Sequence, residues 1–213
     1  AAVSGNSYVG GIVGSADGTT VENAINTGTI EGNSKSETNV GGLIGEMKDS
    51  NLTDNYSSEL IGNSYNLGDV SGNGHNVGGL VGSASNSTIG DGTNLVYNRL
   101  DVTGAYNVGG IVGNMEANST VKNAENSGTV EATEYYDGTY KYHAGTDNTT
   151  DSVIKKVNVA NVGGIAGISS NSTITNVENS GDVSTETIGD SGDNSHIYRA
   201  GNVGGVVGSA VNT

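Results

Sequence analysis

The chain has 213 residues, of which 36 are glycine, and only 33% of the residues are hydrophobic. Its 23 acidic and 8 basic residues give a formal net charge of −15, and the basic residues form no long patch, which argues against nucleic-acid binding. Cysteine is absent, which excludes disulfides and thiol catalysis, and no apolar run approaches the roughly 20 residues of a membrane span. Regularly placed β-branched residues nevertheless favour an ordered chain over a disordered one.

A six-residue motif, Val-Gly-Gly-aliphatic-aliphatic-Gly, recurs along the whole chain, with alanine once in the second aliphatic position. It begins at Val9, Val40, Val77, Val108, Val162 and Val203. Five copies are directly preceded by asparagine, at Asn39, Asn76, Asn107, Asn161 and Asn202. The glycine pair is not followed by the GxxxxGK[ST] pattern of a phosphate loop, so we expect it to form a tight corner where neighbouring segments approach closely. Such self-similarity indicates a repeat fold.

Two further apolar segments follow the motif in the first five copies. The second segment, such as VENAIN at 21–26 or VKNAEN at 121–126, alternates in the manner of a strand with one buried face. The third is shorter, such as GTIEG at 28–32 or GDVSG at 68–72. An asparagine lies four residues before the central Ile or Val of each third segment, at Asn26, Asn66, Asn98, Asn126 and Asn179.

Three short strands per repeat predict an all-β fold, a parallel β-helix (β-solenoid) that we expect to be right-handed. Residues 1–213 would form one domain of about five to six coils, with equivalent strands stacked in parallel. Side chains at matching positions then form columns along the stack. The two sets of asparagines are therefore expected to form inward-facing structural ladders, bonded to the turn backbone and to their equivalents in the next coil.

The repeat unit resembles the GLUG repeat of bacterial surface proteins. The resemblance is carried by NVGGLVG at 76–82, by the STI that follows and by units such as GDVSG at 68–72, and it covers nearly the whole chain. It implies export and a location at the bacterial cell surface, as in large adhesins. GLUG repeats also flank immunoglobulin A-specific zinc peptidases, but the HExxH motif of those enzymes is missing here, so peptidase activity is not implied.

Insertions interrupt the repeat at about 57–65, 131–160 and 185–202, the last two at the corner between the third segment and the next motif. The largest contains TEYYDGTYKYH at 133–143, where Asp137-Gly138 predicts a two-residue hairpin turn. Tyrosines of such a hairpin either contact a glycan or protein partner or cover an outer face of the solenoid. The candidate contact residues are Tyr135, Tyr136, Tyr140 and Tyr142.

Metal sites are weakly indicated. Asp190, Asp193 and Asn194 offer oxygen ligands for calcium, but they lack the EF-hand pattern and the nonapeptide of calcium-binding β-rolls. The three histidines fall in the same corner of coils that are not all consecutive, without carboxylates at the usual zinc-ligand spacing, so we expect them to be solvated: His75, His143 and His196. No cofactor is predicted.

We expect a non-enzymatic, extracellular stalk that displays its side loops, either to a host glycan or protein or as a spacer. An alternative is a fibre subunit that stacks head to tail, and either further repeats or identical copies are expected to cover the solenoid ends. Two other classes are less favoured. A polysaccharide-active enzyme needs clustered carboxylates, whereas Glu22, Lys122, Glu125 and Glu178 are scattered. An ice-binding surface needs flat threonine rows, and the column Thr20, Thr88, Thr120 and Thr173 is expected to be interrupted at Ser50.

Overall fold

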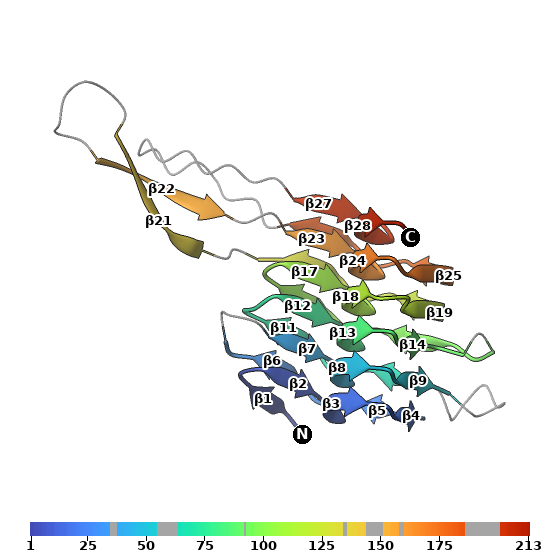
Figure 1. Cartoon of the computed structure of the whole chain (residues 1–213). Coiled ribbons are helices and arrows are strands. Elements are labelled where there is room, and N and C mark those ends of the chain that lie inside the picture. The colour runs from blue at the N-terminus through green and yellow to red at the C-terminus, as the bar shows by residue number, and fades with distance from the viewer. Residues whose placement is uncertain are drawn as a thin grey trace.

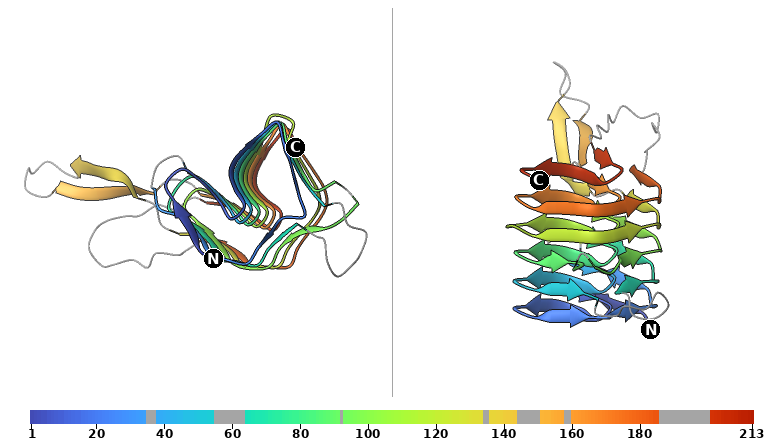
Figure 2. Two further views of the ribbon diagram at one scale, coloured as in Figure 1. Left: turned by 90° about the horizontal axis from the view of Figure 1, so that it is seen from below. Right: turned by 90° about the vertical axis from the view of Figure 1, so that its right-hand side faces the viewer.

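The computed structural model describes residues 1–34, 38–54, 64–91, 93–133, 136–143, 151–157, 160–185 and 201–213. Every regular element in these ranges is a β-strand, and none of them contains a helix that is long and apolar enough to cross a membrane. The strands form four parallel sheets that run along one axis, with one coil of the chain above the next (Figures 1 and 2). A separate two-stranded antiparallel sheet lies outside this stack.

Sheet 1 is built from the third segments of the repeat and the two following sheets from the Val-Gly-Gly motif. Sheet 1 contains β1 (Val3–Gly5), β6 (Ile30–Gly32), β11 (Val70–Gly72), β16 (Val102–Gly104), β20 (Val130–Ala132) and β26 (Val183–Thr185). Sheet 2 contains β2 (Tyr8–Gly10), β7 (Asn39–Gly41), β12 (Asn76–Gly78), β17 (Asn107–Gly109), β23 (Asn161–Gly163) and β27 (Asn202–Gly204). Sheet 3 contains β3 (Val13–Asp17), β8 (Ile44–Lys48), β13 (Val81–Ser85), β18 (Val112–Glu116), β24 (Ala166–Ser170) and β28 (Val207–Val211).

Sheet 4 is formed by the second segments. It contains β4 (Thr20–Glu22), β5 (Ile25–Asn26), β9 (Asn51–Thr53), β10 (Tyr65–Asn66), β14 (Thr88–Ile89), β15 (Val96–Asn98), β19 (Thr120–Asn126) and β25 (Thr173–Asn179). The segment is one strand in β19 and β25 but two in the earlier coils. Asn23, Asn123 and Asn176 have left-handed backbone angles, with φ of 51°, 48° and 52°, and asparagine tolerates this conformation better than most residues.

The register of all four sheets is set by the repeat. Val9, for example, pairs with Val40, which pairs with Val77, and the sheet 1 column runs from Val3 through Ile30 to Val70 in the same way. The predicted parallel β-solenoid is therefore confirmed, together with the stacking of equivalent residues. Shifting one strand by a residue would turn its buried valine to the solvent, which is why the hydrophobic pattern fixes the register.

The coil has four sides and not the three expected from the sequence, because the Val-Gly-Gly motif bends. In the second coil the bend falls at Gly42 and Leu43, between β7 and β8. The corner is too tight for a side chain at the first glycine, since a Cβ on Gly41 would lie 2.0 Å from the carbonyl oxygen of Ile44. Glycine thus divides one apolar run into the strands of sheets 2 and 3.

This bend divides the interior into two hydrophobic cores. One core contains the valines of sheets 1 and 2, including Val40 and Val70, and the other contains larger side chains of sheets 3 and 4, including Met47 and Leu52. Between them, the second glycine of the motif packs against an asparagine of sheet 4, as Gly42 does against Asn66. Figure 2 (left) looks along the stack and shows the outline of each coil turned inwards at this place.

The long excursion at 133–160 leaves the stack between sheets 1 and 2 and contains β21 (Tyr136–His143) and β22 (Asp151–Val157), which pair in antiparallel fashion (Figure 1). The predicted turn at Asp137-Gly138 was wrong. Both residues lie within β21, where the pairing with β22 changes register between Tyr136 and Thr139. Asp137-Gly138 therefore lies at a β-bulge, where β21 has one more residue than the strand opposite.

Candidate functional site

The interior asparagine ladder runs along the waist between the two cores. The amide nitrogens of Asn26, Asn66, Asn98 and Asn126 each donate one hydrogen bond to a carbonyl two residues later and a second to the asparagine of the following coil. For Asn98, these are Leu100 O at 2.7 Å and Asn126 Oδ1 at 2.8 Å. The other links join Asn26 to Asn66, Asn66 to Asn98 and Asn126 to Asn179, at 2.7 to 3.1 Å. Because Asn66, Asn98 and Asn126 are fully buried, the ladder satisfies amides that would otherwise be costly to bury.

The second asparagine ladder lies on the outside of the stack. Asn76 donates to Asn39, Asn107 to Asn76, Asn161 to Asn107 and Asn202 to Asn161, each at 2.8 Å. These side chains are half-buried, except that of Asn202, which is exposed. The expected inward orientation therefore holds for the column of Asn98 but not for that of Asn76. The two ladders also donate in opposite directions along the axis.

A buried serine column, which sequence reasoning missed, closes the turn before sheet 4. Ser87 Oγ donates to Ser85 O at 2.8 Å and accepts the backbone N–H of Ser50 at 3.1 Å, so that it joins two coils. Ser50 and Ser119 make equivalent contacts. The signal in the sequence is the serine of the NST triplets at 86–88, 118–120 and 171–173, which recurs directly before the second segment of the repeat.

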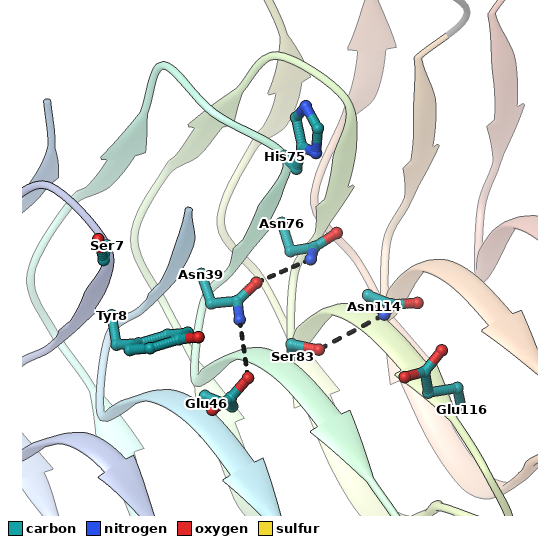
Figure 3. A pocket seen from close by; sticks show the side chains of 9 residues that line it. All are labelled: Ser7, Tyr8, Asn39, Glu46, His75, Asn76, Ser83, Asn114 and Glu116. Carbon is teal, nitrogen blue, oxygen red and sulfur yellow. Dashed lines mark hydrogen bonds between the residues drawn. The ribbon is translucent and has the colours of Figure 1, made fainter. Parts of the chain in front are cut away.

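A polar groove with a volume of about 470 Å³ lies between sheets 2 and 3 (Figure 3). Asn39 and Asn76 line one wall and Glu46, Ser83 and Asn114 the other. The remaining lining residues are Ser7, Tyr8, His75 and Glu116. The groove exists because the glycine bend folds the two sheets towards each other without side chains at the corner.

Hydrogen bonds hold both walls of this groove, which we call the outer groove. Asn39 donates to Glu46 Oε1 at 3.3 Å, across the groove from sheet 2 to sheet 3 (Figure 3). On the second wall, Asn114 donates to Ser83 Oγ at 3.4 Å. At the rim, the His75 and Tyr106 rings meet edge to face with centroids 4.7 Å apart. The lining side chains are thus placed by contacts between coils.

An aromatic stack lies on the outer side of sheet 4. The rings of Tyr65 and Tyr97 are parallel, with centroids 4.9 Å apart, and Arg99 Cζ lies 4.6 Å from the Tyr97 centroid. Burial raises the pKa of Tyr97 above its ordinary value of 10.0, Arg99 lowers it, and Tyr65, Glu125 and Asp54 add to the rise. This stack ties two coils together through ring contact and a cation–π interaction.

The candidate contact residues of the insertion are only partly within the structure. Tyr136, Tyr140 and Tyr142 lie on β21, whereas Tyr135 lies outside the described residues. The calcium candidates Asp190, Asp193 and Asn194 also lie outside them, as does His196. In the part of the chain that the structure describes, no group of three or more His, Asp or Glu side chains is arranged to hold a metal ion.

The threonine column was assigned the wrong interruption. Thr20 and Thr88 both pair with Asn51 and not with Ser50, and the column continues through Thr120 to Thr173. Ser50 is 1% exposed and belongs to the buried serine column. Ser50 directly precedes Asn51, so an alignment shifted by one residue places it in the threonine column.

The charged residues considered for an enzyme lie in different columns of sheet 4. Glu22 pairs with Thr53, Lys122 with Thr175 and Glu125 with Glu178. Glu125 and Glu178 are thus adjacent in one column, next to Tyr97. The described part of sheet 4 places Lys122 and Glu125 three residues apart along β19, on either side of the left-handed Asn123.

A comparison with protein-family models finds the GLUG motif at residues 5–31 and 104–131. The chain carries GLUG repeats. Each matched GLUG segment begins at the last residue of a sheet 1 strand and reaches the middle of the next, and so comprises one coil. A search of curated proteins found no match, and a search of solved structures likewise found none.

Proposed function

We propose that the chain is a non-enzymatic structural and adhesive module on the outside of a bacterial cell, in which a stiff stack of coils displays side loops. The observation that carries this proposal is the continuous pairing of six coils in sheets 1, 2 and 3. Two amide ladders and one serine column reinforce the pairing. Parallel strands joined along the whole axis resist bending and stretching, because any local opening breaks several hydrogen bonds at once.

The position of the excursions supports a display role. The connections from sheet 1 to sheet 2 differ in length between coils. The longer ones separate β6 from β7, β20 from β23 and β26 from β27, and the strands on both sides of them remain paired with the neighbouring coils. Figure 2 (left) shows β21 and β22 extending away from the stack. The stack therefore tolerates large segments at one corner. The GLUG motif supports the assignment to surface proteins through the resemblance described above, and the proposed role requires no cofactor.

The adhesive role is tested by replacing residues 133–160 with Ala-Tyr, the connection that joins β16 to β17 at residues 105–106. The variant should keep the far-ultraviolet circular dichroism and urea-unfolding midpoint of the parent. It should lose binding to a printed glycan array or to immobilised extracellular-matrix proteins. Binding that survives the replacement would contradict adhesion through this loop.

The non-enzymatic role is tested separately. Incubation of the full chain with soluble polysaccharides and with casein should release neither reducing ends nor peptides. Release of either product, abolished by substitution of Glu125 or Glu178, would overturn this part of the proposal. Antibody labelling of intact cells tests the surface location, because an internal protein would be labelled only after lysis.

A second candidate function is a fibre subunit whose copies stack end to end. It is favoured by apolar side chains on the two end coils, with Val203 and Val211 exposed by 49% and 50% at one end and Ile12 by 48% at the other. Among the described strands of sheet 1, the outer strands β1 and β26 each have a partner on one side only. Unpaired strand edges of this kind favour association. Sedimentation velocity should show concentration-dependent growth, whereas a monomer at all concentrations would contradict this candidate.

A further inference from the structure

The outer groove has donors and acceptors that form no second hydrogen bond within the part of the chain that the structure describes. The amide nitrogen of Asn76 carries two hydrogens, and its ladder contact to Asn39 uses one of them. Asn39 likewise donates one hydrogen bond, to Glu46. Among the described residues, each of these amides uses one of its two N–H groups, so the other is open to a partner in the groove. The carboxylate of Glu46 also accepts from Ser15 Oγ at 3.4 Å, but it and the hydroxyl of Ser83 keep lone pairs for a further donor.

These groups recur at the spacing of the coils, about 4.8 Å along the axis. The lining runs from Tyr8 in the first coil to Asn114 and Glu116 in the fourth, a rise of roughly 14 Å over three steps. In the next coil, the residue paired with Asn114 is Ile168, which ends the polar column on that wall. The groove is thus straight, polar and about four repeats long.

The spacing of the coils indicates which type of polymer fits the outer groove. An extended peptide advances about 3.3 Å per residue, so its polar groups would fall out of phase with coils spaced at about 4.8 Å. The strands of both walls are also already paired within their sheets, which leaves no edge in the groove for strand addition. A hexopyranose unit in an extended chain is about as long as one coil is high.

The charge of the groove selects the ligand further. Its lining contains Glu46 and Glu116 but no lysine or arginine, and the chain carries a net charge of −15. Polyanions, including nucleic acids and uronic-acid polymers, would be repelled by this surface. Uncharged hydroxyl groups suit it, because each donates to carboxylate or amide oxygens and accepts from amide N–H groups. The Tyr8 ring, 52% exposed at one end, offers a face on which a sugar ring can stack.

We propose that the outer groove binds a linear, uncharged polysaccharide whose extended chain lies parallel to the solenoid axis, with one sugar unit per coil over about four coils. This site goes beyond the proposed function, because the ligand contacts the stack itself and not the side loops. In the second and third coils, each sugar would be held by one amide of the sheet 2 wall (Asn39 or Asn76) and one polar group of the sheet 3 wall (Glu46 or Ser83). In the first and fourth coils, Tyr8 and Asn114 would provide the contacts. Affinity would come from repetition of individually weak contacts.

The test uses isothermal titration calorimetry with β-1,4-linked gluco-, manno- and xylo-oligosaccharides of two to six units. At least one series should bind, with an affinity that rises up to about four units and then levels off. Ser83→Tyr fills the middle of the groove and should weaken binding at least tenfold. Thr103→Tyr adds the same bulk to an outward position of sheet 1 and should leave the affinity unchanged.

Three results would overturn the proposal: no binding by any uncharged series at millimolar concentration, equal binding by the Ser83→Tyr variant, or preferred binding of tetragalacturonate. Unfolding in urea checks that both tyrosine variants retain the parent fold. Glu46→Gln serves as a second groove variant that preserves shape, and its affinity should fall because the carboxylate acceptor is lost. Replacement of residues 133–160 should leave oligosaccharide binding intact, which separates this site from adhesion through the loop.

Discussion

Gly42 lies directly against the side-chain amide of Asn66, and a Cβ on Gly42 would come within 2.5 Å of Asn66 Cγ. The same contact recurs between Gly79 and Asn98 and between Gly110 and Asn126. It joins the bend of the Val-Gly-Gly motif to the interior ladder of the same coil. The second glycine of the motif and the asparagine of the second segment are therefore one structural unit, although they are 15 or more residues apart in the chain.

Gly42→Ala should destabilise the stack by about 3 kcal/mol, at the upper end of the usual cost of overpacking, because its Cβ would also lie 2.1 Å from the backbone oxygen of Gly79. Gly205→Ala is the matched control from the same position of the last coil, where nothing lies within 4 Å of the added atom. Its unfolding free energy should differ from the parent by less than about 0.5 kcal/mol. Urea denaturation measures both, and equal midpoints for the two variants would refute the packing argument.

Removal of a side-chain amide should reduce the free energy of unfolding more in the interior asparagine ladder than in the outer one. Asn98→Ala leaves the Asn66 donor, the Asn126 acceptor and the Leu100 carbonyl unpaired in a dry interior, and should reduce stability by about 3 kcal/mol. Asn107→Ala removes a half-buried ladder member that water can replace, and should cost about 1 kcal/mol. Comparison of the unfolding midpoints at equal m-value tests the ranking. The reverse order would show that the interior ladder is not the stronger one.

Ser87→Ala should destabilise the protein by about 2 kcal/mol, because the buried Ser50 N–H loses its partner. Ser85 C=O loses the Ser87 hydroxyl but keeps the backbone N–H of Asp49. Ser85→Ala is the control, since it removes a neighbouring hydroxyl but keeps the backbone carbonyl that Ser87 contacts. Amide hydrogen exchange gives a second measure, because the Ser50 N–H should exchange faster only in the Ser87 variant. Unchanged protection of Ser50 would contradict this role.

The aromatic stack gives the stability a dependence on alkaline pH. The pKa of Tyr97 is raised above 10.0 in the folded state. The protonated phenol therefore contributes to the free energy of unfolding fully at pH values below the pKa of the unfolded chain, and this contribution is lost as the pH rises through the pKa of the folded protein. The free energy of unfolding should therefore fall more steeply above pH 10 for the parent than for Tyr97→Phe. Tyr8→Phe removes a phenol that is 52% exposed and should retain the steep fall. Identical pH profiles for the parent and Tyr97→Phe would show that the stack does not titrate with folding.

The register of the solenoid could be predicted because its columns repeat the same residue types. Valine stacks on valine and asparagine on asparagine, so the spacing along the chain is enough to align the coils. The glycine pair indicated a tight corner, but the apolar pattern did not show that this corner divides the motif between two sheets and gives the coil a fourth side. The deciding contact, Gly42 with Asn66, joins two segments whose proximity only the fold establishes.

The outer groove was missed for a related reason. Asn39 and Asn76 were predicted to form a ladder, but whether their side chains face inward or outward depends on the bend. Glu46 and Ser83 belong to no motif that would mark them as groove residues in the sequence. The position of Asp137-Gly138 shows the converse case. The dipeptide has a strong local preference for a turn, but pairing of β21 with β22 places it at a bulge within β21.

The opposite directions of the two asparagine ladders affect how the stack can grow. In a helix, aligned peptide groups add up to a macrodipole with charge at each end. Here Asn98 donates towards the C-terminal end and Asn107 towards the N-terminal end, so the dipoles of their ladders largely cancel in every coil. The net dipole of the two ladders therefore does not grow as coils are added, so these ladders place no electrostatic limit on the number of coils.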